Sequence, residues 1–463
     1  MKRTLWLALI LLLVCVFCVF AFSACDTERE TDAHVHTFGK WSTVKEATCT
    51  VKGEQERSCS CGEKETQSID ALGHTDGQWI INKNATTTEN GKQSLSCDIC
   101  GQKLKEEVIP ATGSFGLLYE FDNSKNGYYV KGLGTCQDSH IYIPEYHNNY
   151  PVVGIGTEAF YNCFQLQNIT IGINVQQIRE KAFYGCINLK CVEGGQSVRG
   201  IYKCDFYNCT NLKSFSIGSA VEYIGWSAFE KCTSLTDVTI PDSVTQIDYY
   251  AFMGCSSITN LYIGKNVKDI GDFAFRECSA LTNIVIPDNV SNIGRSAFSN
   301  CLKLKEIYIG KGTKTIGQYA FASCPNVEKI SINQENQTFH SVDNCVINTN
   351  KKELVFGCKE SLIPKDESVT SIGYGAFYGC TLLESISIPE GVVVIDSRAF
   401  EECTNLKIIT MPSSIIKIGF ASFIDSPNIL EVNYCGTEAD WNNIDIDTFG
   451  NDSLTNAYIV FVQ

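Results

Sequence analysis

The sequence is poor in histidine and in basic residues, and these shortages exclude several classes of function. Its 463 residues hold 37 Lys and Arg against 52 Asp and Glu, which gives a formal net charge of −15. A protein that binds nucleic acid needs a basic stripe, and one that binds anionic lipid needs a polybasic cluster. Neither is visible, so we expect no nucleic-acid partner and no electrostatic attachment to lipid.

Histidine is absent from the most regular part of the chain. The six histidines are His34, His36, His74, His140, His147 and His340, and none lies between 152 and 332 or after 340. A Ser-His-Asp or Cys-His arrangement cannot be assembled there, and no Gly-rich phosphate loop follows a strand. Carboxylates such as Asp237 and Glu306 could face one another, but charged rows on an exposed sheet are usually solvated. We therefore expect no enzymatic activity.

The N-terminus carries the pattern of a targeting segment. A short basic start precedes residues 5–22, which are nearly all apolar, and the tetrapeptide FSAC ends at Cys25. This pattern resembles a bacterial lipoprotein signal, in which residues 1–24 are removed and the Cys25 thiol receives a lipid. An uncleaved membrane anchor is the alternative, because the run is long enough to span a bilayer. Either way the remainder lies outside the cytoplasmic membrane, and residues 25–33 form a charged tether.

Two related cysteine-bearing segments follow, module 1 (residues 34–73) and module 2 (residues 74–113). The motif HTxGxW begins at His36 and again at His74, and CSCG at 59–62 is matched by CDICG at 97–101. The segments resemble small modules of bacterial surface proteins in which ATC, CxxCG and GH motifs recur. We expect them to act as a stalk.

A structural zinc site is one interpretation of these modules, because paired cysteines with a histidine can close a tetrahedron. The residues that module 1 could offer are Cys49, Cys59, Cys61 and His74. Module 2 keeps Cys97 and Cys100 but has Thr87 in place of Cys49 and Ser114 in place of the terminal histidine. A complete site in module 2 is therefore not expected, and a local disulfide or free thiols are the alternative to zinc.

From residue 152 onward one pattern recurs, VxxIGxxAFxxCxxLxxIxI followed by Pro or Gly. Its phenylalanine lies every 23 residues in two runs, Phe160 to Phe321 and Phe377 to Phe423. Such a period indicates a solenoid, because one unit cannot bury its apolar edge alone. In one unit, residues 224–235 have the apolar spacing of a short helix, and residues 235–240 alternate like a strand. We therefore predict an α/β solenoid of 23-residue units with a parallel sheet on one face.

The repeat pattern is similar to the BspA-like class of bacterial leucine-rich repeats over residues 115–463. Tyr434, Cys435 and Trp441 resemble that family's C-terminal cap, and the strand-rich region before the repeats resembles its N-terminal cap. The resemblance divides the chain into N-terminal cap, repeats, insertion, repeats and C-terminal cap at residues 114–151, 152–332, 333–368, 369–428 and 429–463. The insertion holds two apolar runs around an Asn/Lys turn, which predicts a hairpin.

Ten cysteines lie three residues after the repeat phenylalanine, and Ser426 replaces the cysteine of the eleventh unit. Stacked units place neighbouring cysteines about one strand spacing, 4.7–4.9 Å, apart with parallel Cβ directions, which does not suit a disulfide. We expect small, buried side chains that fill the core. Local pairing of Cys345 with Cys358, or of Cys191 with Cys204, remains open.

One unit departs from the pattern. It has Asp205 where the other units have Ala, and Gly194-Gly195 where its strand should close. These changes predict a distorted unit.

The outward positions of the predicted sheet form the expected ligand-binding face. They include two neighbouring columns, one of Asn260, Asn283 and Glu306 and the other of Tyr262, Val285 and Tyr308. Most outward residues are small or polar, but the second column is large and apolar on three successive units. Aromatic residues are frequent among binding hot spots, although Tyr is also a good strand former.

The leading hypothesis is a cell-surface lipoprotein that binds a protein or a surface polymer without catalysis, as the resemblance loosely implies. One alternative is a structural coat or spacer of the cell envelope. The other is a metal- or solute-capturing lipoprotein that uses the cysteine modules. Apart from the zinc considered for module 1, we expect no cofactor.

Overall fold

The computed structural model describes residues 35–462 of the chain. The predicted signal peptide, Cys25 and the tether lie outside the described residues. The chain forms two compact units. The first consists of Met1–Trp79 with Ser94–Lys105, and the second, which holds the repeats, consists of Ile80–Gln93 with Glu106–Gln463.

The cysteine modules contain short strands with very little core. One sheet has the order β1-β2-β3, formed by β1 (Ser42–Lys45), β2 (Gly53–Ser58) and β3 (Lys64–Ile69). Another has the order β4-β5-β6, formed by β4 (Asp76–Lys83), β5 (Gly91–Cys97) and β6 (Lys103–Ile109). The buried apolar side chains of described residues 35–113 are Cys49, Cys59, Leu95, Cys97 and Ala111.

A strand-rich cap precedes the repeats. Its strands are β7 (Leu118–Asp122), β8 (Gly127–Gly132), β9 (His140–Ile143), β10 (Tyr146–His147) and β11 (Tyr150–Ile155). β8 pairs antiparallel with β7 and parallel with β11. β9 pairs in register with the first strand of the repeats, so the cap continues the sheet and covers the end of the core.

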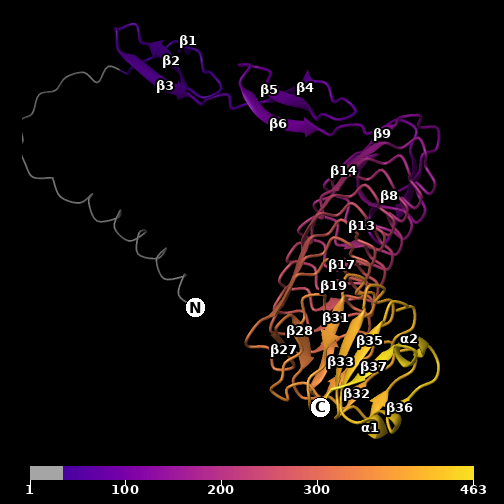
Figure 1. The fold of residues 1–463 in the computed structure, drawn as a ribbon. Helices are drawn as coiled ribbons and strands as arrows, with labels where there is room; N and C mark the ends of the chain where they lie inside the picture. Colours follow the sequence, from indigo (N-terminus) through magenta and orange to yellow (C-terminus); the bar gives the residue numbers. More distant parts are fainter. Residues whose placement is uncertain (1–34, 463) are drawn as a thin grey trace, which may run out of the picture. The chain divides into compact units, whose positions relative to one another are not determined.

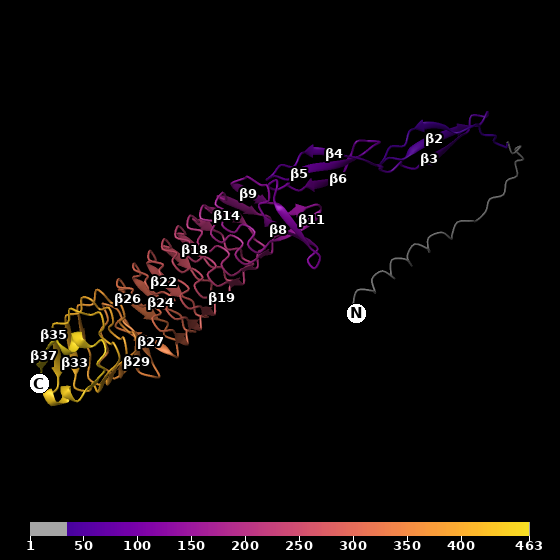
Figure 2. The same cartoon turned by 90° about the vertical axis from the view of Figure 1, so that its right-hand side faces the viewer.

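Each repeat unit contributes one strand to a row of parallel strands, here called the first sheet, as the alternation of LxxIxI predicts. The row is divided into four hydrogen-bonded groups. These strands are β12 (Asn168–Ile171), β14 (Cys191–Gly194), β16 (Ser214–Phe215), β18 (Asp237–Thr239), β20 (Asn260–Tyr262), β22 (Asn283–Ile286), β24 (Glu306–Ile309), β26 (Lys329–Ile332), β31 (Ser385–Ser387) and β33 (Ile408–Pro412). Figure 2 shows β18 and β22 along one side of the stack. Most inward side chains are buried, with Phe215 and Leu261 half-buried, and the outward ones are mostly exposed or half-buried.

The units also form a second parallel sheet, which the sequence pattern did not predict. The VxxI segment of each unit gives a strand of two residues: β13 (Gln177–Ile178), β15 (Gly200–Ile201), β17 (Tyr223–Ile224), β19 (Gln246–Ile247), β21 (Asp269–Ile270), β23 (Asn292–Ile293), β25 (Thr315–Ile316), β30 (Ser371–Ile372), β32 (Val394–Ile395) and β34 (Lys417–Ile418). From β15 to β25 these strands are consecutive neighbours in one sheet.

The short helix expected in each unit does not form within the described residues; tight turns take its place. In one unit, Ser227 and Lys231 have left-handed backbone angles, φ 55° and 62°. A right-handed helix cannot pass through such residues. Backbone hydrogen bonds join these turns to the next unit. For example, Phe229 N donates to Ala251 O at 2.7 Å. The α/β description is therefore corrected to a solenoid of strands and turns.

The repeat phenylalanines form two stacks in the core, one from Phe160 to Phe321 and the other from Phe377 to Phe423. Phe160 and Phe183 lie with ring centroids 5.3 Å apart, and Phe229 and Phe252 lie 5.0 Å apart, with almost parallel planes. All eleven repeat phenylalanines are almost completely buried. Within each stack the ring of one unit contacts the ring of the next, so the fixed 23-residue period keeps the rings in register.

The repeat cysteines are buried, as predicted, and their thiols also make hydrogen bonds. The Cys186 thiol donates to the carbonyl of Phe160 at 2.9 Å, and the same bond recurs along the stack. The Ser426 hydroxyl donates to Phe400 O at 2.7 Å. A small side chain with one donor therefore suits this position, which explains why serine can replace cysteine. No disulfide joins the repeat cysteines of the described residues.

The insertion joins the second sheet. Its strands are β27 (Phe339–Val342), β28 (Cys345–Asn348) and β29 (Glu353–Phe356). β28 and β29 pair antiparallel around the Asn/Lys turn, as the two apolar runs predict, and β29 then pairs parallel with β30. Phe356 lies 5.4 Å from Phe321, so it extends the aromatic stack into the insertion.

The unit with Asp205 is distorted only locally. Gly194 and Gly195 have left-handed angles, φ 80° and 68°, where β14 ends. Phe206 still stacks 5.0 Å from Phe183. Asp205 itself is completely buried among apolar neighbours.

The last elements close the far end of the core. They are β35 (Glu431–Cys435), α1 (Glu438–Asn442), β36 (Asp445–Ile446), α2 (Asp452–Thr455) and β37 (Tyr458–Phe461). Within the described residues α1 and α2 are the only helices, and both lie at the C-terminal end of the array (Figure 1). Tyr434 is fully buried there, with its ring 5.3 Å from Trp441.

Candidate functional site

The first sheet presents the predicted column of Tyr262, Val285 and Tyr308. Tyr262 pairs with Thr239 of the preceding strand, and Val285 pairs in register with Tyr308 of the next. Tyr262 is 54% exposed and Val285 is 59% exposed, whereas Tyr308 is half-buried. Ile284, which directly precedes Val285 in β22, is buried. Because side chains alternate along a strand, the large apolar side chains of this column point outward.

Two hollows on this face share Val285. One has a volume of about 300 Å³ and is bounded by Tyr262, and the other has a volume of about 290 Å³ and is bounded by Tyr308. Asn283 contributes to both. A projecting side chain of a partner could therefore contact an apolar wall and an amide at once.

A polar column runs beside the apolar one. Asn260, Asn283 and Glu306 are all exposed, and Glu306 pairs in register with Lys329. The Asn260 amide donates to Asp237 Oδ1 at 2.6 Å, and this hydrogen bond lowers the pKa of the Asp237 carboxyl. The face thus combines an apolar strip with a neighbouring row of polar and charged groups, as binding surfaces commonly do.

The structure divides the zinc ligands predicted for module 1 between two groups. Cys49 and His74 lie with two cysteines of module 2, whereas Cys59 and Cys61 lie with His36. The sequence analysis instead combined Cys59 and Cys61 with Cys49 and His74. The shared period of 38 residues was the signal that could have corrected it, since His36 and His74 occupy equivalent positions.

The structure also shows a basic, aromatic pocket of about 470 Å³ on the turn side of the repeats. Its ionisable and aromatic lining includes Arg276, Arg295, Arg398, Tyr319, Tyr374 and Tyr378. Arg398 already binds Glu401 through two contacts of 2.9 and 2.7 Å, and the Tyr319 and Tyr374 hydroxyls are 2.7 Å apart. These residues come from different turns. The sequence did not predict this pocket. The sequence analysis expected a helix where the structure has turns, and a helix directs these side chains differently.

Cys25, the predicted lipid-attachment residue, lies outside the described residues. Among residues 35–462, no helix has the length and apolar character needed to cross a membrane.

The comparisons with known proteins agree with the repeat architecture. A family model described as the BspA type leucine rich repeat region matches residues 136–259, 245–366 and 357–461. These matches cover well over half of the sequence, and the chain belongs to the BspA-type leucine-rich repeat family.

Two solved structures illustrate the likeness. A leucine-rich cell surface protein of Faecalibacterium prausnitzii is 25% identical, with a TM-score of 0.48, over 73% of this chain and 98% of its own. A leucine-rich repeat protein of Bacteroides ovatus is also 25% identical, with a TM-score of 0.45, over 75% of this chain and 98% of its own. A search of the curated proteins finds no match.

Proposed function

We propose that this chain is a non-enzymatic binding protein of the bacterial surface, which contacts a protein or a polymer through the first sheet. The observation that carries the proposal is the outward column of Tyr262, Val285 and Tyr308. Large exposed apolar side chains on a strand are unfavourable in water unless a partner covers them. The two hollows around Val285 give such a partner places to insert side chains.

We further propose that the chain is anchored as a lipoprotein through Cys25, on the strength of the FSAC tetrapeptide. Mass spectrometry of the protein from its native membrane tests this directly. We expect a mature chain that begins at a lipid-modified Cys25. A mature mass that retains residues 1–24 would refute it and favour an uncleaved anchor.

The binding proposal is tested with the double variant Tyr262→Ser, Tyr308→Ser. The purified chain is screened on immobilised matrix proteins and mucins, and the affinity for any saturable ligand is then compared between variants. Because aromatic anchors carry much of the energy of an interface, we expect binding to weaken by about 2 kcal/mol or more. The thermal midpoint should change little, because the rings pack on the surface of the sheet.

A matched control removes two exposed rings elsewhere. Tyr202 is 36% exposed and Tyr249 is 50% exposed, and both lie in the turns that follow the second sheet. Tyr202→Ser with Tyr249→Ser should leave the affinity unchanged. Full binding by the Tyr262, Tyr308 double variant would place the interaction elsewhere, first at the insertion turn of residues 348–352. No saturable binding to any ligand would favour a coat or spacer.

A further inference from the structure

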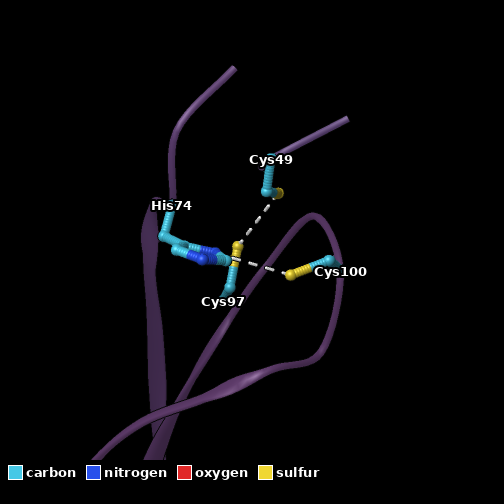
Figure 3. A group of neighbouring side chains, drawn as sticks. All are labelled: Cys49, His74, Cys97 and Cys100. Carbon is cyan, nitrogen blue, oxygen red and sulfur yellow. Dashed lines mark hydrogen bonds between the residues drawn. The ribbon is translucent and has the colours of Figure 1, made fainter. Parts of the chain in front are cut away.

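Four side chains of the cysteine modules converge on one point (Figure 3). The ligand atoms of Cys49, His74, Cys97 and Cys100 all lie within 4.8 Å of one another. The sulfur atoms of Cys49 and Cys97 are 3.7 Å apart, and Cys100 Sγ lies 3.5 Å from His74 Nδ1. A disulfide would need a sulfur–sulfur distance of about 2.05 Å, so this arrangement is something else.

Two of the distances between these ligand atoms match the edges of a tetrahedron around a zinc ion. With Zn–S bonds of about 2.3 Å and Zn–N bonds of about 2.0–2.1 Å, tetrahedral edges measure about 3.8 Å between two sulfurs and about 3.5 Å between sulfur and nitrogen. The Cys49–Cys97 and Cys100–His74 distances agree with those edges. Three cysteines and one histidine are also a ligand set that structural zinc sites use.

Local backbone bonds place each ligand. The Cys49 carbonyl accepts a hydrogen bond from Gly73 N at 3.1 Å, which brings the start of module 2 beside Cys49. Cys97 ends β5, and the turn to Cys100 is closed by Gly101 N donating to Cys97 O at 2.9 Å. Gly101 has a left-handed φ of 71°, which a glycine adopts without strain.

These modules also need a cross-link. All side chains of β1 are exposed, and all those of β3 are exposed or half-buried. Three of the five buried apolar residues in this region are cysteines, and two of these three, Cys49 and Cys97, belong to the cluster. Small domains with so little core are usually stabilised by disulfides or by a structural metal.

We propose that Cys49, His74, Cys97 and Cys100 bind one zinc ion that joins module 1 to module 2. All four positions around the ion are filled by protein, which indicates a structural role and not the capture or activation of a solute. Module 2 thus takes its fourth ligand from the module before it. At the position equivalent to Cys49, module 2 has Thr87. Module 2 therefore has no equivalent cysteine to share with a segment that follows it.

The second group fits the same scheme. His36, Cys59 and Cys61 occupy in module 1 the places of His74, Cys97 and Cys100 in module 2, and His36 Nδ1 lies 3.2 Å from Cys61 Sγ. The group offers three ligands among the described residues. The group of four ligands is the site to which we assign the zinc ion.

The test measures zinc in the full chain, purified in detergent under reducing conditions without chelator. Plasma mass spectrometry should give at least one zinc per chain. Replacement by cobalt should produce the visible absorption of a tetrahedral site with thiolate ligands. Cys49→Ser and Cys97→Ser should each lose one equivalent of metal, whereas Cys49→His, which keeps a ligand atom, should retain it.

The matched control is Cys61→Ser, which removes an exposed thiol of the other group. It should leave the equivalent lost in Cys97→Ser in place. Zinc that is lost in Cys61→Ser but kept in Cys97→Ser would overturn the assignment and restore the site predicted from the sequence, in which Cys59 and Cys61 are ligands. Absence of zinc and of the cobalt spectrum, or a disulfide between Cys97 and Cys100 in the native protein, would overturn the zinc proposal itself.

Discussion

At the scale of single residues, the array tolerates one costly side chain. Asp205 occupies a position that is alanine in other units, for example Ala182 and Ala228. Its Oδ2 accepts a hydrogen bond from Tyr202 N at 2.7 Å, but its Oδ1 has no partner. Burial raises the pKa of this carboxyl well above its ordinary value, although the bond from Tyr202 N opposes the shift. A buried polar group that is only partly satisfied reduces stability.

We therefore expect Asp205→Ala to increase the free energy of unfolding by about 1–3 kcal/mol at pH 7. The folded chain keeps a proton on Asp205 that the unfolded chain releases above about pH 4. The proton on Asp205 thus stabilises the folded chain at low pH. This contribution to the free energy of unfolding is lost as the pH rises toward the folded-state pKa. Urea unfolding at pH 5 and pH 8 measures both effects.

The control for this prediction is Asp205→Asn. It removes the ionisation but keeps a polar group, so it should flatten the pH dependence without the full gain of alanine. A loss of stability in Asp205→Ala would mean that the bond to Tyr202 N outweighs the cost of burial.

At the scale of elements, the sequence predicted strands better than turns. The LxxIxI segment alternates over several residues, which identifies a half-buried strand. The VxxI strand is only two residues long, too short for alternation to reveal. The spacing around the repeat phenylalanine fits a helix and a series of tight turns equally well. The left-handed positions are occupied by such varied residues as Lys181, Ser227 and Tyr250, so they give no compositional signal.

The left-handed backbone conformation predicts that different substitutions at these positions reduce stability by different amounts. Gly254 has φ 72°, and a Cβ there would have its nearest neighbour at 3.6 Å, so space is not the constraint. Gly254→Val should destabilise the chain by about 1–2 kcal/mol, because a β-branched residue resists this conformation. Gly254→Asn should cost less, since the equivalent residue of another unit is Asn208, with φ 59°. Thermal melts of the two variants provide the comparison, and equal losses would contradict it.

The two candidate sites differ in how well they could be predicted from the sequence. Outward columns follow from strand alternation alone, so Tyr262, Val285 and Tyr308 could be placed on one face before the fold was known. The cysteine cluster could not, because Cys49 lies closer in sequence to Cys59 than to Cys97. Only the folded backbone, with Gly73 bonded to Cys49, shows which cysteines meet.

At the scale of the whole molecule, the core of the repeat array is divided into two parts, and the contact between them is here called the junction. The buried residues form two clusters, which meet at the insertion. Val346 and Phe356 belong to the first cluster, and Ile347 and Leu354 belong to the second. Cooperative unfolding of a repeat array depends on the contacts between neighbouring units. The insertion therefore determines whether both runs of repeats unfold together.

Phe356→Ala should weaken that junction. The ring is 7% exposed and packs against Phe321, and removing a buried phenylalanine typically costs about 3–5 kcal/mol. We expect denaturant unfolding followed by circular dichroism to separate into two transitions. Phe252→Ala, in the middle of the first run, serves as the control and should lower stability without separating the runs at the insertion. A single transition in Phe356→Ala would show that the two runs are coupled by other contacts.

The burial of the repeat thiols has a practical consequence for labelling. Burial raises the pKa of the repeat thiol of Cys186 to about 12, and the thiolate is the form that reacts. A maleimide dye should therefore spare the buried repeat cysteines. The exposed thiols of the described residues are Cys61, Cys100 and Cys435. Of these, only Cys435 lies in the C-terminal cap, so the native chain carries a reactive handle at that end to which a fluorophore or a surface can be coupled without engineering.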